Sequence, residues 1–132
     1  MPEKQKILVV DDGKDIRDLL GHCLKSEGYE VDLAGDGQEG LGKFPDSYFA
    51  LFTDLEMPGL DGVGLIKGAR ERGYIGAAFL MSATPDSVDK YLAVHGLTKE
   101  QFYSPVYCNG FLKKPFSTIT APLEMLREYR PQ

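Results

Sequence analysis

Four groups of residues in this 132-residue chain combine carboxylates, a hydroxyl and amines in an order that suits phosphoryl chemistry. Asp11 and Asp12 follow one apolar run, Asp54 follows a second, Ser82 a third, and residues 113–114, both lysines, a fourth. Carboxylates that lie close together repel one another unless a cation neutralises them. Mg²⁺ suits such a group because it accepts one or two carboxylates, several waters and a phosphate oxygen. If the four groups meet, an aspartate is placed to attack phosphorus while the lysine and the hydroxyl hold the phosphoryl oxygens.

Each group also has an ordinary structural explanation. Asp11 and Asp12 are suited to cap a following helix, and Asp54 precedes the turn-forming residues 57–59, Met-Pro-Gly. Ser82 could form a local hydrogen bond, and the two lysines could be a solvated pair beside a proline. Taken singly, none of them indicates a site. Their repeated arrival at the ends of apolar runs favours function over coincidence.

The elements that must position these groups are visible as five short apolar runs, at residues 7–10, 30–34, 49–53, 77–81 and 110–112. The first, third and fourth runs are continuously apolar, as expected of strands buried on both faces of a parallel sheet. The second run alternates between polar and apolar residues, which is typical of a strand nearer the edge. The runs therefore predict a sheet with a buried centre.

Segments with helical spacing lie between and after the runs. The first carries apolar residues at helical intervals from Ile16 to Leu24 and is ended by Gly28, and the others are predicted at residues 38–44, 63–72, 87–94 and 120–129. Alternation of strands and helices predicts an α/β fold with right-handed crossovers. We expect a flavodoxin-like, five-stranded parallel sheet of order 2-1-3-4-5 with helices on both faces. In that order strands one, three, four and five are neighbours, so their carboxyl ends form one crevice.

Composition narrows the classes of function. The net charge is −5, which argues against direct binding of nucleic acid. Cys23 and Cys108 have no metal-binding spacing, so we expect reduced, buried thiols. Residues 1–6 are polar, and no apolar run reaches the length of a membrane span. The sequence therefore predicts a single cytoplasmic domain over residues 1–132 that neither spans nor contacts a membrane.

Four motifs resemble those of the response-regulator receiver domains of two-component signalling systems. They are ILVVDD at 7–12 with Arg17, FTDLEMPGLDG at 52–62, MSA at 81–83 and FLKKPF at 111–116. The resemblance spans nearly the whole chain, and the motif at 52–62 is the most specific. It implies a signalling switch that accepts a phosphoryl group from a histidine kinase or a histidine phosphotransfer protein.

The resemblance also implies a role for individual residues. Asp54 is expected to be the phosphoacceptor and to share a Mg²⁺ ion with Asp12, with Asp11, mostly through water, and with the backbone carbonyl of Glu56. Lys114 is expected to bind the phosphoryl group, whereas Lys113 occupies a variable position of the family.

Further expectations concern the switch itself. Ser82 corresponds to the switch hydroxyl and Phe111 to its aromatic rotamer partner, and the peptide bond before Pro115 is expected to be cis. Glu56 and Thr84 should flank the path of an attacking water. We hypothesise that Glu56 influences autodephosphorylation, and the alternative is that it is a solvated surface residue.

The chain departs from the family between Ser82 and Lys114, where 114 − 82 = 32 positions are more than one helix and one strand require. The excess lies at residues 97–107. Thr98 and Gln101 fit a capping box, so we predict an additional short helix from Lys99 that ends before Pro105, between the fourth helix and the fifth strand. Aromatic residues 102, 103 and 107 should pack on those elements. This insertion either contributes to the binding of an output partner or is a tolerated surface elaboration.

Two other classes of function remain open at this point. A phosphatase resembling the haloacid dehalogenases also uses an aspartate nucleophile with Mg²⁺, but that class has a second aspartate where this chain has Glu56. A receiver-like interaction module that never accepts phosphate is weakened by the presence of every expected side chain. The sequence does not decide whether the domain acts alone or belongs to a larger regulator or hybrid kinase.

Overall fold

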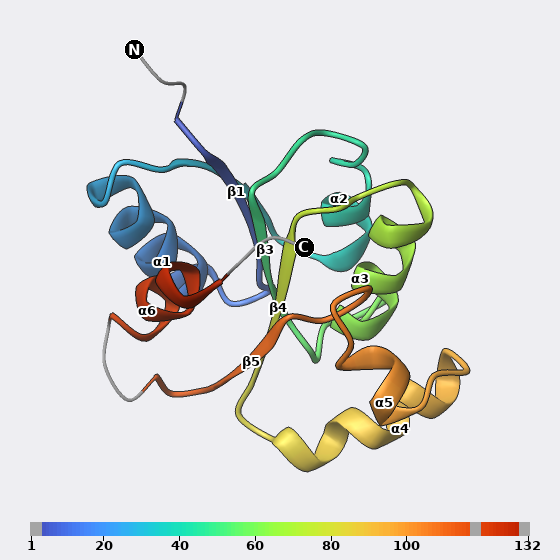
Figure 1. Cartoon of the computed structure of the whole chain (residues 1–132). Helices are drawn as coiled ribbons and strands as arrows, with labels where there is room; N and C mark the ends of the chain where they lie inside the picture. Colours follow the sequence, from blue (N-terminus) through green and yellow to red (C-terminus); the bar gives the residue numbers. More distant parts are fainter. Residues whose placement is uncertain (1–3, 117–119, 130–132) are drawn as a thin grey trace.

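The computed structural model describes residues 4–116 and 120–129, and Figure 1 shows how their elements are arranged. Of the polar start at residues 1–6, residues 1–3 lie outside this description, as do residues 130–132. The strands are β1 (Lys6–Val10), β2 (Glu30–Ala34), β3 (Ala50–Asp54), β4 (Ala77–Ser82) and β5 (Gly110–Lys113). All four pairings are parallel and the order is β2-β1-β3-β4-β5, so the predicted sheet and its order are confirmed.

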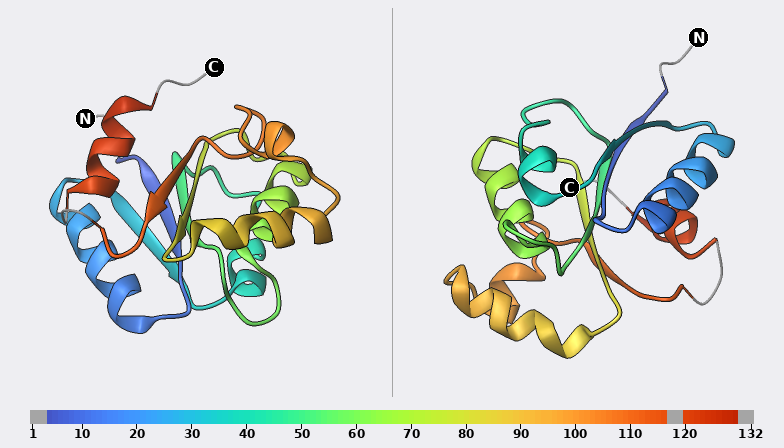
Figure 2. Two further views of the ribbon diagram at one scale, coloured as in Figure 1. Left: turned by 90° about the horizontal axis from the view of Figure 1, so that it is seen from below. Right: turned by 180° about the vertical axis from the view of Figure 1, so that it is seen from behind.

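Helices cover both faces of the sheet. They are α1 (Lys14–Ser26), α2 (Gly37–Leu41), α3 (Gly62–Glu71), α4 (Val88–Val94), α5 (Lys99–Phe102) and α6 (Ala121–Glu128). In Figures 1 and 2, α1 and α6 lie on one face of the sheet and α2 to α5 on the other. The predicted helix at 38–44 is shorter than expected, because the chain turns after Leu41 and Phe44 enters the core from outside the helix.

Two hydrophobic cores lie on opposite faces of the sheet, as the period of a strand requires. In β1, Ile7 and Val9 pack with α1 and α6, whereas Leu8 and Val10 pack with the helices of the other face. All four of these side chains are fully buried. Strand β2 is less buried and lies at the edge of the sheet, as its alternating sequence predicts. Because both faces are packed, the register of the strands, and hence the position of their ends, is fixed.

The insertion at 97–107 contains the predicted short helix. Helix α5 begins after Thr98, whose side chain accepts from the backbone N–H of Gln101, and the reciprocal bond completes the capping box. Phe102 is fully buried in the core, and Tyr107 packs against the same core. Tyr103 departs from the prediction, since it contacts Phe102 edge-on and remains 42% exposed. The insertion is thus part of the core on one side and exposed on the other.

Arg70 of α3 anchors the end of the insertion. Its guanidinium donates to the backbone carbonyls of Tyr74, Gly76 and Tyr107 and to Oδ1 of Asn109. The same Asn109 oxygen accepts from the backbone N–H of Ala78 in β4 at 2.8 Å. A planar guanidinium with five donors suits this task, because it satisfies several carbonyls at once. None of the helices within residues 4–116 and 120–129 has the length and apolar character needed to cross a lipid bilayer.

Candidate functional site at the carboxyl edge of the sheet

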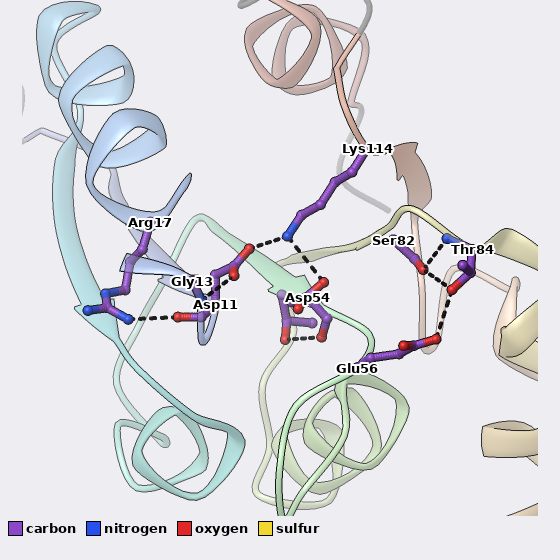
Figure 3. A network of polar contacts seen from close by, with 9 residues as sticks. Asp11, Gly13, Arg17, Asp54, Glu56, Ser82, Thr84 and Lys114 are labelled. Carbon is purple, nitrogen blue, oxygen red and sulfur yellow. Dashed lines mark hydrogen bonds and ion pairs between the residues drawn. The ribbon is translucent and has the colours of Figure 1, made fainter. Parts of the chain in front are cut away.

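The carboxyl ends of four adjacent strands bring the predicted residues together. Asp11 follows β1, Asp54 ends β3, Ser82 ends β4, and Lys114 follows β5. The register places Asp54 opposite Met81 and Ser82 opposite Lys113, so the strand ends are level. Figure 3 shows the side chains of Asp11, Asp54 and Lys114 pointing toward one another across this edge.

Three carboxylates form the acidic part of the site. One oxygen each from Asp11, Asp12 and Asp54 lies within 4.8 Å of the others. Asp11 is 1% exposed and Asp54 is 9% exposed, while Asp12 faces solvent. Oxygen donors of this charge and spacing fit a hard divalent cation such as Mg²⁺, which retains waters on its open side. The carbonyl of Glu56 remains a predicted further ligand.

The chain between β1 and α1 fixes the first two carboxylates. Asp11 accepts from the backbone N–H of Gly13 at 2.8 Å, and Nη1 of Arg17 donates to the backbone carbonyl of Asp11 at 2.8 Å. Gly13 is the N-cap of α1, and no side chain caps that helix. The interpretation of Asp11 and Asp12 as helix caps is therefore wrong. Sequence reasoning included Arg17 in the motif but gave it no role, since only the fold shows that it holds this loop.

Lys114 supplies the positive charge of the site. Its Nζ contacts Oδ2 of Asp11 and lies 3.2 Å from Oδ1 of Asp54. Lys113, its neighbour, is exposed. The peptide bond between Lys114 and Pro115 is cis, as predicted. One ammonium group thus lies between two of the three carboxylates.

Burial and charge both act on the titration of this cluster. Burial raises the pKa of the Asp54 carboxyl to about 6; Lys114 opposes this shift, and the charges of Asp11 and Asp12 add to it. Burial also opposes the charge of Lys114, but its contacts with Asp11 and Asp54 outweigh that effect and raise its pKa. The site is therefore short of positive charge, which favours the binding of a cation.

Ser82 lies at the same edge but faces away from the acidic cluster (Figure 3). Its hydroxyl accepts from the backbone N–H of Thr84 at 3.0 Å and lies 3.3 Å from the hydroxyl of Thr84. The Thr84 hydroxyl in turn donates to Oε1 of Glu56 at 2.8 Å. Hydrogen bonds from Thr84 and Ser87 hold the pKa of Glu56 below its ordinary value. Glu56 is therefore bound across the edge of the site.

Phe111, the predicted aromatic partner of Ser82, is half-buried against the core on the α2–α5 face. It comes from β5, where it pairs with Leu80 of β4, two residues before Ser82. The structure thus places Phe111 near the end of the strand that carries the hydroxyl. Its role as a rotamer partner remains a prediction.

Known proteins resemble this chain in sequence. The profile of the family described as the response regulator receiver domain matches residues 7–121. The alkaline phosphatase synthesis transcriptional regulatory protein PhoP of Bacillus subtilis is 32% identical over 117 residues, covering 86% of this chain and 43% of that protein. A CpxR homolog of Haemophilus influenzae is 32% identical over 89 residues, covering 67% of this chain and 39% of that protein. The chain spans less than half the length of these curated relatives.

Solved structures resemble it in fold. The chemotaxis protein CheY4 of Vibrio cholerae superposes with a TM-score of 0.73 at 27% identity, over 95% of this chain and 98% of that one. The response regulator TrrA of Thermotoga maritima, solved in complex with Mg²⁺ and BeF, has a TM-score of 0.70 at 30% identity, over 91% and 93% of the two chains. Both similarities cover nearly the entire fold described here.

Proposed function

Because this chain belongs to the family of response regulator receiver domains, a component of two-component signalling, we propose that it is a phosphorylation-controlled switch whose phosphoacceptor is Asp54. The observation that carries the proposal is the meeting of three carboxylates and Lys114 at the carboxyl edge of the sheet. Asp54 is the member of the cluster that ends the central strand and contacts the lysine. Receiver domains interact with histidine kinases and phosphotransfer proteins, and we propose one of these as the donor.

The proposed chemistry needs a cation in the acidic cluster. Asp11, Asp12 and Asp54 would hold Mg²⁺, together with the carbonyl of Glu56, and the ion would neutralise charge on the phosphoryl oxygens. An oxygen of Asp54 attacks phosphorus while the bond from phosphorus to the donor nitrogen breaks, and that nitrogen keeps the electron pair and takes up a proton. Lys114, whose ammonium group contacts Asp11 and Asp54, binds a phosphoryl oxygen.

Phosphorylation changes which partner the Ser82 hydroxyl prefers. In the structure this hydroxyl bonds to Thr84, whereas a phosphoryl group on Asp54 offers oxygens with more negative charge. We expect Ser82 to leave Thr84 and to draw the β4–α4 connection toward Asp54, with Phe111 filling the space that is released. A switch of this kind accepts and loses its own phosphoryl group rather than turning over a substrate.

Phosphorylation by a small donor tests the proposal. The protein is incubated with Mg²⁺ and acetyl phosphate, and the adduct is followed by intact mass. We expect a stoichiometric, labile adduct in the wild type and in Asp46→Asn, which changes an exposed carboxylate on the opposite edge. The adduct should be absent in Asp54→Asn. Rapid turnover of phosphomonoesters would instead indicate a phosphatase, and a wild type without adduct would indicate an inert module.

The exposed side of the insertion is a candidate surface for the output partner. Val94 at the end of α4, Tyr103 and Val106 are 76%, 42% and 66% exposed. Deleting residues 98–107 would also remove the buried Phe102, so a sharper test changes exposed side chains only. The experiment compares the proteins that phosphorylated wild type and the double variant Tyr103→Ser/Val106→Ser retain from a lysate of the cells of origin. The matched control is Ile75→Ser, because Ile75 is 92% exposed on another surface.

A protein retained by the wild type and by Ile75→Ser, but lost from the double variant, would support this role of the insertion. Equal retention by all three proteins would indicate that the insertion is only a surface elaboration.

The extent of the domain, its location in the cell and its lack of contact with nucleic acid also stay predictions. A single domain over residues 1–132, a cytoplasmic location and the absence of direct nucleic-acid contact are proposed from the sequence alone.

A further inference from the structure

The loop that follows Asp54 contacts both ends of the segment that contains α4. At its start, Glu56 accepts hydrogen bonds from Thr84 and from Ser87, which lie just before α4. At its end, Oδ2 of Asp61 lies 2.8 Å from Nε2 of His95, the residue that directly follows α4. One loop of residues 55–61 therefore holds this helix at two points through two carboxylates.

The contact between Asp61 and His95 is directional and largely shielded from water. Oδ1 of Asp61 accepts from the backbone N–H of Gly64 at 2.9 Å and caps α3, which leaves Oδ2 for the histidine. The side chains of His95 and Asp61 are 20% and 11% exposed. Because a carboxylate only accepts, Nε2 of His95 donates. A charge-assisted bond with little solvent is stronger than an exposed one.

Helix α3 is shaped to receive the end of α4. A Cβ atom at Gly64 would lie 2.7 Å from Cε1 and 2.8 Å from Nε2 of His95, so a larger residue would displace the imidazole. One turn further along, Nζ of Lys67 donates to the backbone carbonyl of His95 at 3.2 Å. The side chain and the main chain of His95 are thus both bound by α3 and its cap.

The same loop is tied to the main chain of Asp54. The N–H of Gly62 donates to the carbonyl of Leu55 at 2.8 Å. A Cβ atom at Gly62 would collide with the backbone oxygen of Asp54, so the two segments are as close as backbones can come. The loop that carries Glu56 and Asp61 is therefore closed directly against the main chain of Asp54.

We propose that His95 is a positioning residue that couples the C-terminal end of α4 to the phosphorylation site through Asp61. With this bond, both ends of α4 move when Asp54 is phosphorylated. Without it, only the start of α4, which Glu56 holds, moves. The inference rests on the proposed function of Asp54. It assigns a role to a residue that lies 34 positions from its partner in the sequence and outside the acidic cluster.

Three variants separate this role from a general effect on folding. His95→Leu removes the donor, whereas His95→Gln keeps an amide donor near the position of Nε2. His22→Leu changes the only other histidine, which is exposed on α1. The first measurement is amide hydrogen exchange without phosphodonor. We expect His95→Leu to raise the exchange rates of the amides of residues 94–96 about tenfold, the factor for one such hydrogen bond.

The second measurement follows amide chemical shifts after addition of Mg²⁺ and acetyl phosphate, with intact mass recorded on the same samples. In the wild type, both ends of α4 should shift. In His95→Leu the adduct should still form and residues 84–88 should still shift, but the shifts at 93–96 should be lost. His95→Gln should restore them, and His22→Leu should behave as the wild type. A purely structural contact would not separate the two ends in this way.

The outcomes distinguish this inference from the proposed function. If the adduct forms and residues 93–96 of His95→Leu shift as in the wild type, the inference is wrong and the switch stands. If the wild type forms no adduct, both the proposed function and the coupling are wrong. Unchanged hydrogen exchange in His95→Leu would also overturn the inference, because the bond would then not hold the end of α4.

Discussion

The ammonium nitrogen of Lys114 lies 3.2 Å from Oδ1 of Asp54 and also contacts Asp11. One cation therefore serves two buried carboxylates, and a third, Asp12, lies in the same cluster. This imbalance explains why the pKa of Asp54 is raised to about 6 despite the lysine beside it. We therefore expect the site to respond to pH and to divalent cations.

Binding of Mg²⁺ should weaken as the solution becomes acidic. Protons compete with the ion for Asp54, whose pKa is about 6, so the apparent affinity should change little above that pH. Below it, the affinity should fall by up to about tenfold per pH unit. Isothermal titration calorimetry at constant ionic strength, near pH 7 and near pH 5, measures this difference. An affinity that is the same at both values would contradict the titration assigned to Asp54.

Asp54→Asn should stabilise the metal-free protein at neutral pH. The folded-state pKa of about 6 lies above the ordinary value of 3.8, so the native state holds the proton more tightly than the unfolded state. The free energy of unfolding of the wild type therefore falls as the pH rises from 3.8 to about 6, and this loss is complete above about pH 6. Near pH 7, we expect the free energy of unfolding of Asp54→Asn, measured with urea, to exceed that of the wild type by about 1–3 kcal/mol. Near pH 4 this difference should vanish. A gain independent of pH would point to another cause.

The two adjacent lysines should differ sharply in their effect on phosphorylation. Lys114→Met removes a half-buried cation that contacts Asp54, whereas Lys113→Met changes an exposed side chain one residue away. Loss of one preorganised charged donor typically reduces the rate about 10²-fold. We expect a loss of this size for Lys114→Met and wild-type behaviour for Lys113→Met. The initial rate of adduct formation with acetyl phosphate measures both, and equal effects would remove the special role of Lys114.

Glu56→Ala should shorten the lifetime of the phosphorylated state. The carboxylate of Glu56 is bound to Thr84 and Ser87 across the edge of the site. We predict that, in this position, it shields the path of an attacking water. Losing one hydrogen bond of about 1 kcal/mol corresponds to about fivefold in rate. Glu56→Gln keeps an acceptor for Thr84 and should retain most of the lifetime. An unchanged decay of the adduct in Glu56→Ala would remove the hypothesis that Glu56 influences dephosphorylation.

Neighbouring aromatic residues of α5 and its end should contribute very differently to stability. Phe102 is fully buried and Tyr103 is 42% exposed, although their rings touch. Phe102→Ala should lower the free energy of unfolding by about 3–5 kcal/mol. Tyr103→Ala should change it by about 1 kcal/mol or less. Urea unfolding of the two variants measures the contrast, and similar losses would mean that the insertion does not share the core.

Most of the fold could be predicted because its signals are local. Continuous apolar runs identify β1, β3 and β4, and the capping box of Thr98 and Gln101 predicts the start of α5. The ends of the helices were less predictable, since they depend on tertiary packing. The predicted helix at 38–44 ends at Leu41, and Phe44, which lies outside the helix, is buried in the core.

The acidic cluster was predictable for a different reason: parallel strands place their ends at a common edge, and the polar residues sit at those ends. Contacts between distant surface residues have no such pattern. His95 and Asp61 lie on separate elements, and nothing in their sequence environment pairs them. Glycine is unfavourable within a helix, and only the structure shows that the missing Cβ of Gly64 makes room for the imidazole of His95. The orientation of Ser82 depends equally on the fold.

The anchoring of Asn109 by Arg70 and Ala78 separates the length of the insertion from the position of the lysine. Wherever the chain travels after α4, it must return to Asn109, and the pairing of Ser82 with Lys113 then fixes Lys114. An insertion within residues 103–106 should therefore leave the phosphoacceptor in place, although it would disrupt the candidate partner surface that includes Tyr103 and Val106.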